Sequence, residues 1–210
     1  MKIYLVRHGE TDWNKAGRFQ GSTDIPLNPY GIELAEITAE GMKEIPFDII
    51  YSSPLVRSQK TAEIIKRDRN IKIITDDRLK EMNFGNFEGV DIREARADEG
   101  HGMYTLLHTP EKYIPDGGET FEEVIQRCQN FIEEILIPKE KQYDHVMLSV
   151  HGGLIRCFLR CIEDRPIAQF WGGIPQGNCA VTIIELLDGK MQILEEGKLY
   201  YYKEHIGILG

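Results

Sequence analysis

Apolar and polar positions alternate along the chain in a pattern that predicts strands and helices in turn. Short apolar runs, typical of buried strands, lie at 3–6, 48–51, 71–74 and 146–150. Segments with apolar residues three and four positions apart, typical of amphipathic helices, separate these runs. They run from Asn28-Pro29 to about Met42, from Ser53-Pro54 onward, from Thr120 to about Leu136 and from Gly152-Gly153 through Cys161. Strands that alternate with helices predict an α/β fold with a largely parallel sheet.

Capping signals set the ends of two of these helices. Asn28-Pro29 has the composition of an N-cap followed by the first helical residue. Thr120 and Glu123 have the spacing of a capping box. Pro138 lacks a backbone N–H, so we expect it to stop that second helix at about Leu136.

Two regions depart from the regular alternation. The apolar runs 181–187 and 191–194 flank Asp188-Gly189, which predicts an antiparallel hairpin. Residues 79–118 are rich in Gly, Asp and Glu. We expect them to be irregular, with one short helix near Asp91 to Ala97.

Composition narrows the fold and the function classes. The chain has 210 residues, of which 41% are hydrophobic and 28% charged, as in an ordinary soluble protein. We therefore expect residues 1–210 to form one three-layer α/β/α domain, with a mostly parallel central sheet and an antiparallel edge. The formal charge of −9 argues against nucleic acid or an anionic membrane as a partner. No apolar run is long enough to span a bilayer.

The cysteines and the first residues favour a reduced, cytoplasmic protein. None of the four cysteines has a CxxC spacing. Cys157 and Cys161 share a helical face, which is more typical of small core residues than of a metal pair. Met1-Lys2 leads directly into the first strand, so we expect no signal peptide.

Charged side chains follow the predicted strands, and they are the candidates for chemistry. They are Arg7, His8, Arg57, Glu81 and His151. Because the carboxyl ends of parallel strands face the ligand crevice, we expect these five side chains to converge there. Arginine offers a flat charged fork for phosphate oxygens, and a neutral imidazole can attack phosphorus. Each residue alone is more often structural, but two histidines at equivalent strand ends with an arginine beside one favour a phosphate site.

Ordered motifs carry a resemblance to a known family. They are Arg7-His8-Gly9-Glu10-Thr11-Asp12-Trp13-Asn14, Asp24-Ile25-Pro26-Leu27-Asn28, the segments 53–62 and 79–89, Gly117-Gly118-Glu119-Thr120 and His151-Gly152-Gly153. The chain resembles the histidine phosphatase superfamily, the phosphoglycerate mutase-like enzymes, from near its first residue to at least Thr182. It departs from the usual motifs at Asn28, Ser58, Lys60 and Phe87, where Thr, Ala, Gln and Trp are common.

The resemblance implies an enzyme that hydrolyses phosphomonoesters through a phosphohistidine. His8 would attack phosphorus, and Glu81 would protonate the leaving oxygen and later activate water. Arg7, Arg57 and His151 would hold the phosphoryl oxygens, and His151 would do so better as an imidazolium, which the neighbouring phosphate would favour. The attacking nitrogen of His8 must be unprotonated, so its other ring N–H needs an acceptor such as a backbone carbonyl. No metal or other cofactor is expected, because these cations supply the positive charge.

Seven further residues are candidates for binding a small phosphate ester. They are Asn14, Gln20, Gly21, Gly152, His101, Tyr104 and His108. The last three belong to residues 90–118, which we expect to form a partly apolar lid. Arg93 and Arg96 share one face of the short helix there, but acids beside them favour a solvated surface.

Hydrolysis and mutase-type transfer share this catalytic core. In the mutase branch a longer insertion after the acid motif carries an Arg-Arg pair, whereas residues 90–118 are short and have none. This favours a phosphatase over a phosphoglycerate mutase. A specific phosphatase, such as an α-ribazole phosphatase, remains open, and a non-catalytic phosphate-binding regulatory module is disfavoured by the intact set of five residues. The sequence predicts neither the physiological substrate nor the oligomeric state.

Overall fold

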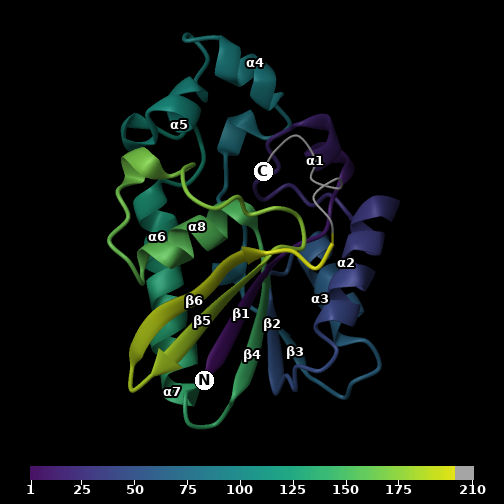
Figure 1. Cartoon of the computed structure of the whole chain (residues 1–210). Helices are drawn as coiled ribbons and strands as arrows, with labels where there is room; N and C mark the ends of the chain where they lie inside the picture. The colour runs from purple at the N-terminus through teal and green to yellow at the C-terminus, as the bar shows by residue number, and fades with distance from the viewer. Residues whose placement is uncertain (202–210) are drawn as a thin grey trace.

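Six strands form one sheet in the computed structural model, which describes residues 1–201 (Figure 1). They are β1 (Lys2–Arg7), β2 (Ile49–Ser52), β3 (Ile73–Thr75), β4 (His145–Val150), β5 (Val181–Leu187) and β6 (Lys190–Lys198), in the order β3-β2-β4-β1-β5-β6. The first four are parallel, and β5 and β6 add an antiparallel edge beside β1. The predicted sheet is therefore confirmed. Residues 202–210 of the predicted domain lie outside the described residues.

Helices cover both faces of the sheet. The longer ones are α2 (Pro29–Gly41), α3 (Val56–Lys66), α6 (Phe121–Phe131) and α8 (Gly152–Arg160), and α1 (Asp12–Ala16) is short. Because side chains of a strand alternate between faces, Ile3 and Leu5 join the core under α6 and α8, whereas Tyr4 and Val6 join the core under α2 and α3. The predicted three-layer α/β/α arrangement is therefore present (Figure 1).

The helix that begins at Thr120 does not end where the sequence predicts. Its capping box is present, since Thr120 and Glu123 bond each other's backbone N–H. However, a π-helical turn η4 (Ile132–Leu136) leads into α7 (Ile137–Lys139), so helical backbone continues past Pro138. The prediction that Pro138 stops the helix is wrong. Proline clashes with the carbonyl four residues before it in a regular α-helix, and a widened turn ahead of it removes this conflict.

The region between β3 and α6 crosses the carboxyl ends of the parallel strands (Figure 1). Its α4 (Ile92–Ala97) is the predicted short helix. The structure adds α5 (Tyr104–His108) and the short 3₁₀ turns η1 (Asp77–Leu79), η2 (Gly85–Phe87) and η3 (Pro110–Lys112), with η5 (Ile167–Gln169) before β5. These short elements place side chains over the strand ends where the charged residues gather.

The β5–β6 hairpin closes the far edge of the sheet as predicted. Asp188 has φ 51° and Gly189 has φ 75°, the pair of left-handed residues that a two-residue type I′ turn requires. Within residues 1–201, no helix is long and apolar enough to cross a membrane.

Candidate active site

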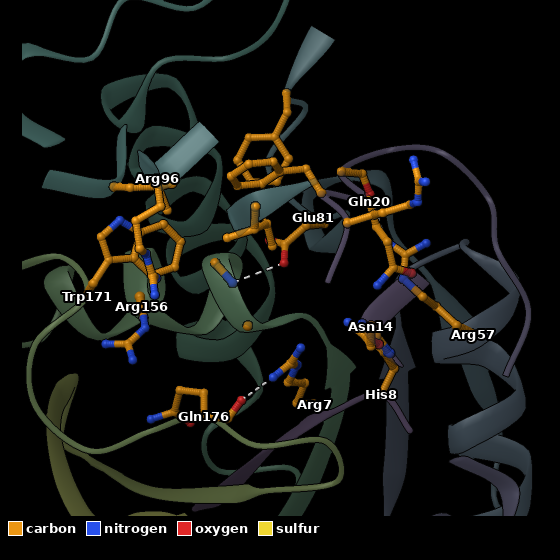
Figure 2. A pocket seen from close by; sticks show the side chains of 18 residues that line it. Arg7, His8, Asn14, Gln20, Arg57, Glu81, Arg96, Arg156, Trp171 and Gln176 are labelled. Carbon is orange, nitrogen blue, oxygen red and sulfur yellow. Dashed lines mark hydrogen bonds between the residues drawn. The ribbon is translucent and has the colours of Figure 1, made fainter. Parts of the chain in front are cut away.

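A cavity of about 240 Å³ opens where β1 and β4 end and α4 and α5 pass over the sheet (Figure 2). We call one part of it the inner end, made of Arg7, His8, Arg57 and Glu81. We call another part the outer end, made of Ile92, Arg96, Leu107, Arg156 and Trp171. Its volume is below the range of about 300–1,000 Å³ that drug-sized ligands occupy, which favours a small metabolite.

His8 follows β1 and is held in one tautomer. Its Nδ1–H donates to the carbonyl oxygen of Gly9 at 2.7 Å, so Nε2 carries a free lone pair. Burial lowers the pKa of His8 well below its ordinary value, and the positive charges of Arg57 and Arg7 lower it further. His8 is therefore neutral near pH 7 and lines the cavity as a potential nucleophile. The backbone acceptor that the sequence analysis required is the carbonyl of Gly9.

Arg7 and Arg57 bring two positive charges to the inner end. The guanidinium of Arg57 donates to the carbonyls of Gly21 at 2.7 Å and Thr23 at 2.8 Å. Arg7 donates to the carbonyl of Gln176, as the dashed line in Figure 2 marks. Burial lowers the pKa of Arg57 to about 10, so this residue stays charged near neutrality. Because carbonyls rather than carboxylates hold both side chains, their charge remains available to an anion.

Glu81 reaches the inner end by capping α8. Its Oε1 accepts from the backbone N–H of Leu154 at 2.8 Å and of Met82 at 2.9 Å, and its Oε2 accepts from that of Gly153 at 3.0 Å. A Cβ on Gly153 would lie 2.8 Å from Oε1, so this position needs glycine for the carboxylate to approach. An ionised carboxylate suits these three donors and the positive end of the helix.

A second layer of contacts, which the sequence analysis missed, holds the Glu81 segment. Arg127 on α6 donates to the carbonyls of Lys80 at 2.7 Å and Glu81 at 3.2 Å. Glu119 accepts from Arg127 Nε at 2.8 Å and from the backbone N–H of Asn83 at 2.8 Å. The Gly-Gly-Glu motif pointed to Glu119, but nothing in the local sequence singled out Arg127.

His151 is fully buried beside His8, and it is not among the residues that line the cavity. The two imidazole rings lie 5.1 Å apart, and His151 Nε2 is 3.3 Å from the hydroxyl of Ser58. Burial lowers the pKa of His151 well below its ordinary value, and the charge of Arg57 adds to this effect. Burial thus favours the neutral imidazole, and the imidazolium that the resemblance implies at His151 would need the negative charge of a phosphate beside it.

Two departures from the family motifs have local explanations. Asn28, where Thr is common, accepts from the Gly31 N–H at 2.7 Å as the N-cap of α2 and donates to Glu10 at 2.9 Å. Ser58, where Ala is common, supplies the hydroxyl beside His151. In the part of the chain that the structure describes, no three His, Cys, Asp or Glu side chains gather as a metal site.

The candidate substrate-binding residues divide into two groups. Those that line the cavity are Asn14, Gln20, Gly21 and Gly152. His101, Tyr104 and His108 do not line it. Tyr104 and His108 stack on each other at 4.1 Å, and His101 Nδ1 accepts from the Met103 N–H at 3.0 Å. Local pairing occupies these three side chains. The apolar lining comes instead from Phe19, Phe84, Ile92, Leu107 and Trp171.

The two arginines of α4 also have different surroundings. Arg93 pairs with the carboxylate of Asp91 at 2.6 Å, as expected on a solvent-exposed helix. Arg96 lines the outer end of the cavity, although the sequence analysis placed it on a solvated surface. Asp91 is the N-cap of α4, and its side chain accepts from the backbone N–H as well as the guanidinium of Arg93.

Comparisons with known proteins agree with this geometry. Residues 3–197 match the histidine phosphatase superfamily (branch 1). The uncharacterized phosphatase PhoE of Bacillus subtilis is 36% identical over 199 residues, 91% of each chain. Phosphoserine phosphatase 1 of Hydrogenobacter thermophilus is 28% identical over 93% of this chain and 91% of its own. The structure of Bacillus stearothermophilus YhfR superposes with a TM-score of 0.87 at 31% identity, over 94% of this chain and 97% of YhfR. The chain therefore belongs to branch 1 of the histidine phosphatase superfamily.

Proposed function

We propose that the protein is a metal-independent phosphatase that hydrolyses small phosphomonoesters through a phosphohistidine at His8. The observation that carries this proposal is the state of His8. Its Nδ1–H is bound to the Gly9 carbonyl at 2.7 Å, its pKa is lowered, and Arg7 and Arg57 line the same cavity. A neutral nucleophile between two cations suits in-line attack on a phosphate dianion.

In the first step, His8 Nε2 forms a bond to phosphorus while the bond from phosphorus to the ester oxygen breaks. Arg7 and Arg57 hold the non-bridging oxygens as negative charge redistributes. The leaving alcohol takes a proton from Glu81, which also lines the cavity. For this step Glu81 must carry a proton, and it then gives up one of its backbone donors.

In the second step, water attacks phosphorus and the bond between phosphorus and Nε2 breaks. Glu81, now ionised, accepts the proton of the water, which yields inorganic phosphate and restores His8. The structure holds Glu81 with its oxygens facing three N–H donors, the arrangement of the ionised state that this step requires. One carboxylate thus serves as acid and then as base.

The remaining candidate residues would position the phosphoryl group. The Oδ1 of Asn14 accepts from the Thr11 N–H at 3.2 Å and from Asn178 at 3.3 Å, so its amide N–H groups are left for an anion. Gln20 Oε1 accepts from the Thr11 hydroxyl at 2.8 Å, which orients the amide of Gln20 in the same way. We assign Gly21 and Gly152 to the cavity wall, where glycine lets the backbone approach the ligand. His151 would bind the phosphate as an imidazolium only once the dianion raises its pKa.

The test is a phosphatase screen over a panel of metabolite esters, with and without EDTA. We expect turnover that survives chelation, with 3-phosphoglycerate mutase activity, assayed in parallel, at a lower level. Loss of activity on chelation, restored by Mg²⁺, Mn²⁺ or Zn²⁺, would show that the arginines are not the sole charge clamp. Absence of all turnover would favour a phosphate-binding regulatory module.

We also propose a cytoplasmic location. Its support is the state of the four cysteines, which are free thiols: Cys128, Cys157, Cys161 and Cys179. Burial raises the pKa of each, which keeps them protonated and unreactive. A fold that leaves its thiols unpaired suits a reducing compartment. Fractionation of cells that express the tagged protein tests the location.

A further inference from the structure

The cavity has more positive charge than one phosphoryl group needs. Five arginines line it, namely Arg7, Arg18, Arg57, Arg96 and Arg156, against one acid, Glu81. The chain as a whole has a formal charge of −9, so this surplus of cations is local to the cavity. Arg7 and Arg57 match the two negative charges of a phosphate monoester dianion. The arginines of the outer end are left without an anion.

Arg156 on α8 is half-buried and has no carboxylate partner in the described chain. Its Nη1 donates to the carbonyls of Phe170 at 3.0 Å and Gly172 at 2.7 Å. The acid that attracts it most, Glu196, is already bound by Arg165 at 2.9 Å and by Gln176 at 3.0 Å. The rest of the Arg156 guanidinium is therefore available to a ligand.

Arg96 on α4 faces the same space. Figure 2 shows Arg96, Trp171 and Arg156 together on the side of the cavity opposite Arg57 and His8. No ion pair involving Arg96 is present among residues 1–201, whereas Arg93, three positions earlier, pairs with Asp91. The indole N–H of Trp171 donates to the Leu106 carbonyl at 2.6 Å, which fixes the wall beside the two arginines.

We propose that Arg96 and Arg156 bind a second anionic group on the alcohol part of the substrate. The substrate class is then a small phosphomonoester that also carries a carboxylate or a second phosphate. Guanidinium groups bind both anions through paired N–H donors, and an anion here would offset the buried charge of Arg156. This inference rests on the proposed function, because it assigns the reacting phosphate to the inner end.

Matched pairs of esters test the substrate class. 3-Phosphoglycerate and glycerol 3-phosphate differ in a carboxylate against a hydroxymethyl group. Fructose 1,6-bisphosphate and fructose 6-phosphate differ in a second phosphate. We expect kcat/KM to be about tenfold or more higher for the anionic member of at least one pair, as a charge-assisted hydrogen bond would give. The pair with the larger ratio identifies the anion, and ratios near one in both pairs would overturn the proposal.

Variants test the residues. Arg96→Ala removes an exposed side chain, and Arg156→Gln removes the charge but keeps an N–H donor for the loop carbonyls. Each should lower the anionic-to-neutral kcat/KM ratio about tenfold. Arg93→Ala, on the same helix but paired with Asp91, is the matched control and should keep the wild-type ratio. An equal fall of the ratio in Arg93→Ala would mean that the overall field, and not a site, sets the preference.

A binding measurement separates this inference from the proposed function. The His8→Ala protein cannot form the phosphohistidine, so calorimetry reports its affinity for each ester without turnover. We expect it to bind 3-phosphoglycerate or fructose 1,6-bisphosphate at least tenfold more tightly than the matched neutral ester. If the wild-type protein hydrolyses none of the esters, nor p-nitrophenyl phosphate, the proposed function fails. The binding preference for the anionic esters would still show whether the second anion site exists. Equal affinities within both pairs would overturn the second site alone.

Discussion

The inner and outer ends of the cavity hold their side chains in different ways. At the inner end, His8 bonds the Gly9 carbonyl, Arg57 bonds two carbonyls and Glu81 accepts three backbone N–H groups. At the outer end, Arg96 is exposed and has no ion-pair partner within the described chain. Trp171 keeps 39% of its surface exposed. Backbone groups thus fix the inner end on several sides. At the outer end backbone carbonyls hold Arg156 and Trp171, but Arg96 has no ion pair within the described chain.

The difference follows from what each end has to bind. A phosphoryl group has the same oxygens in every phosphomonoester, so a rigid set of donors can be aligned to its transition state in advance. The alcohol part changes from one substrate to another, and side chains on short helices and loops can differ at little cost to the fold. On the proposed function, we therefore expect the inner end to set the reaction class and the outer end to set substrate choice.

The largest effect is expected from replacing the nucleophile. His8→Ala should reduce turnover of every ester by about 10⁴-fold or more, because no other group can accept the phosphoryl group. The measurement is kcat/KM, together with trapping of an acid-labile phosphoryl adduct that should map to His8 in the wild-type protein alone. Circular dichroism controls for folding. Wild-type-like turnover by the variant would show that His8 is not the nucleophile, and the inner end would then not be the reacting end.

Glu81→Gln should have a large effect that depends on the leaving group. Without the acid, an alkyl phosphate should lose about 10²–10⁴-fold in kcat/KM, whereas an aryl phosphate, whose leaving oxygen needs little protonation, should lose much less. Arg57→Ala is the comparison variant, since it removes charge stabilisation and should harm both substrates to a similar degree. Equal losses for Glu81→Gln on the two substrates would show that Glu81 positions other groups and does not donate the proton.

The buried histidines of the active site should make stability depend on pH. His8 and His151 have lowered pKa values in the folded protein, so below their unfolded value of about 6.5 the unfolded chain binds protons that the folded chain does not. The free energy of unfolding should therefore decrease as the pH is lowered below about 6.5. The decrease is up to about 1.4 kcal/mol per pH unit for each histidine. Urea unfolding between pH 7.5 and 5.5 measures it.

Single variants assign this pH dependence. His8→Gln should make the slope shallower but not remove it, because His151 still contributes. His108→Gln, at an exposed position outside the cavity, should keep the slope. The same slope in His8→Gln as in the wild-type protein would mean that His8 is not the source.

The smallest effect is expected at the outer end. Trp171→Phe removes the indole donor of the hydrogen bond to the Leu106 carbonyl, which joins α5 to the loop before β5. The loss should cost about 1 kcal/mol, the net value of one hydrogen bond, and should be confined to this region. Amide hydrogen exchange should become faster in α5 while β1 keeps its protection. Faster exchange throughout the sheet would show that the two ends are mechanically coupled.

The inner end could be predicted from the sequence because its residues lie at the carboxyl ends of strands or in the segments that follow them. Topology brings such positions to one edge, so Arg7 and Glu81 could be placed together before any contact was known. The outer end could not be predicted, because Trp171 lies far along the chain from Arg96 and their meeting depends on tertiary packing. Arg93 and Arg96 share a helical face in sequence, but in the structure Arg93 pairs with Asp91 and Arg96 lines the cavity. Pro138 does not stop the helix because the π-helical turn before it avoids the clash that proline makes in a regular α-helix.

The contact between Glu81 and α8 has a consequence for how catalysis can be observed. The side chain of the N-cap residue, His151, makes no capping hydrogen bond to α8. Instead, the carboxylate of Glu81, from a different segment, accepts from the first N–H groups of this helix. In the proposed mechanism a proton leaves Glu81 in the first half-reaction and returns in the second, and while it is bound it weakens the acceptor of the first turn of this helix. The amide signals of Gly153 and Leu154 then act as built-in reporters, whose NMR shifts follow the catalytic proton without any label on the substrate.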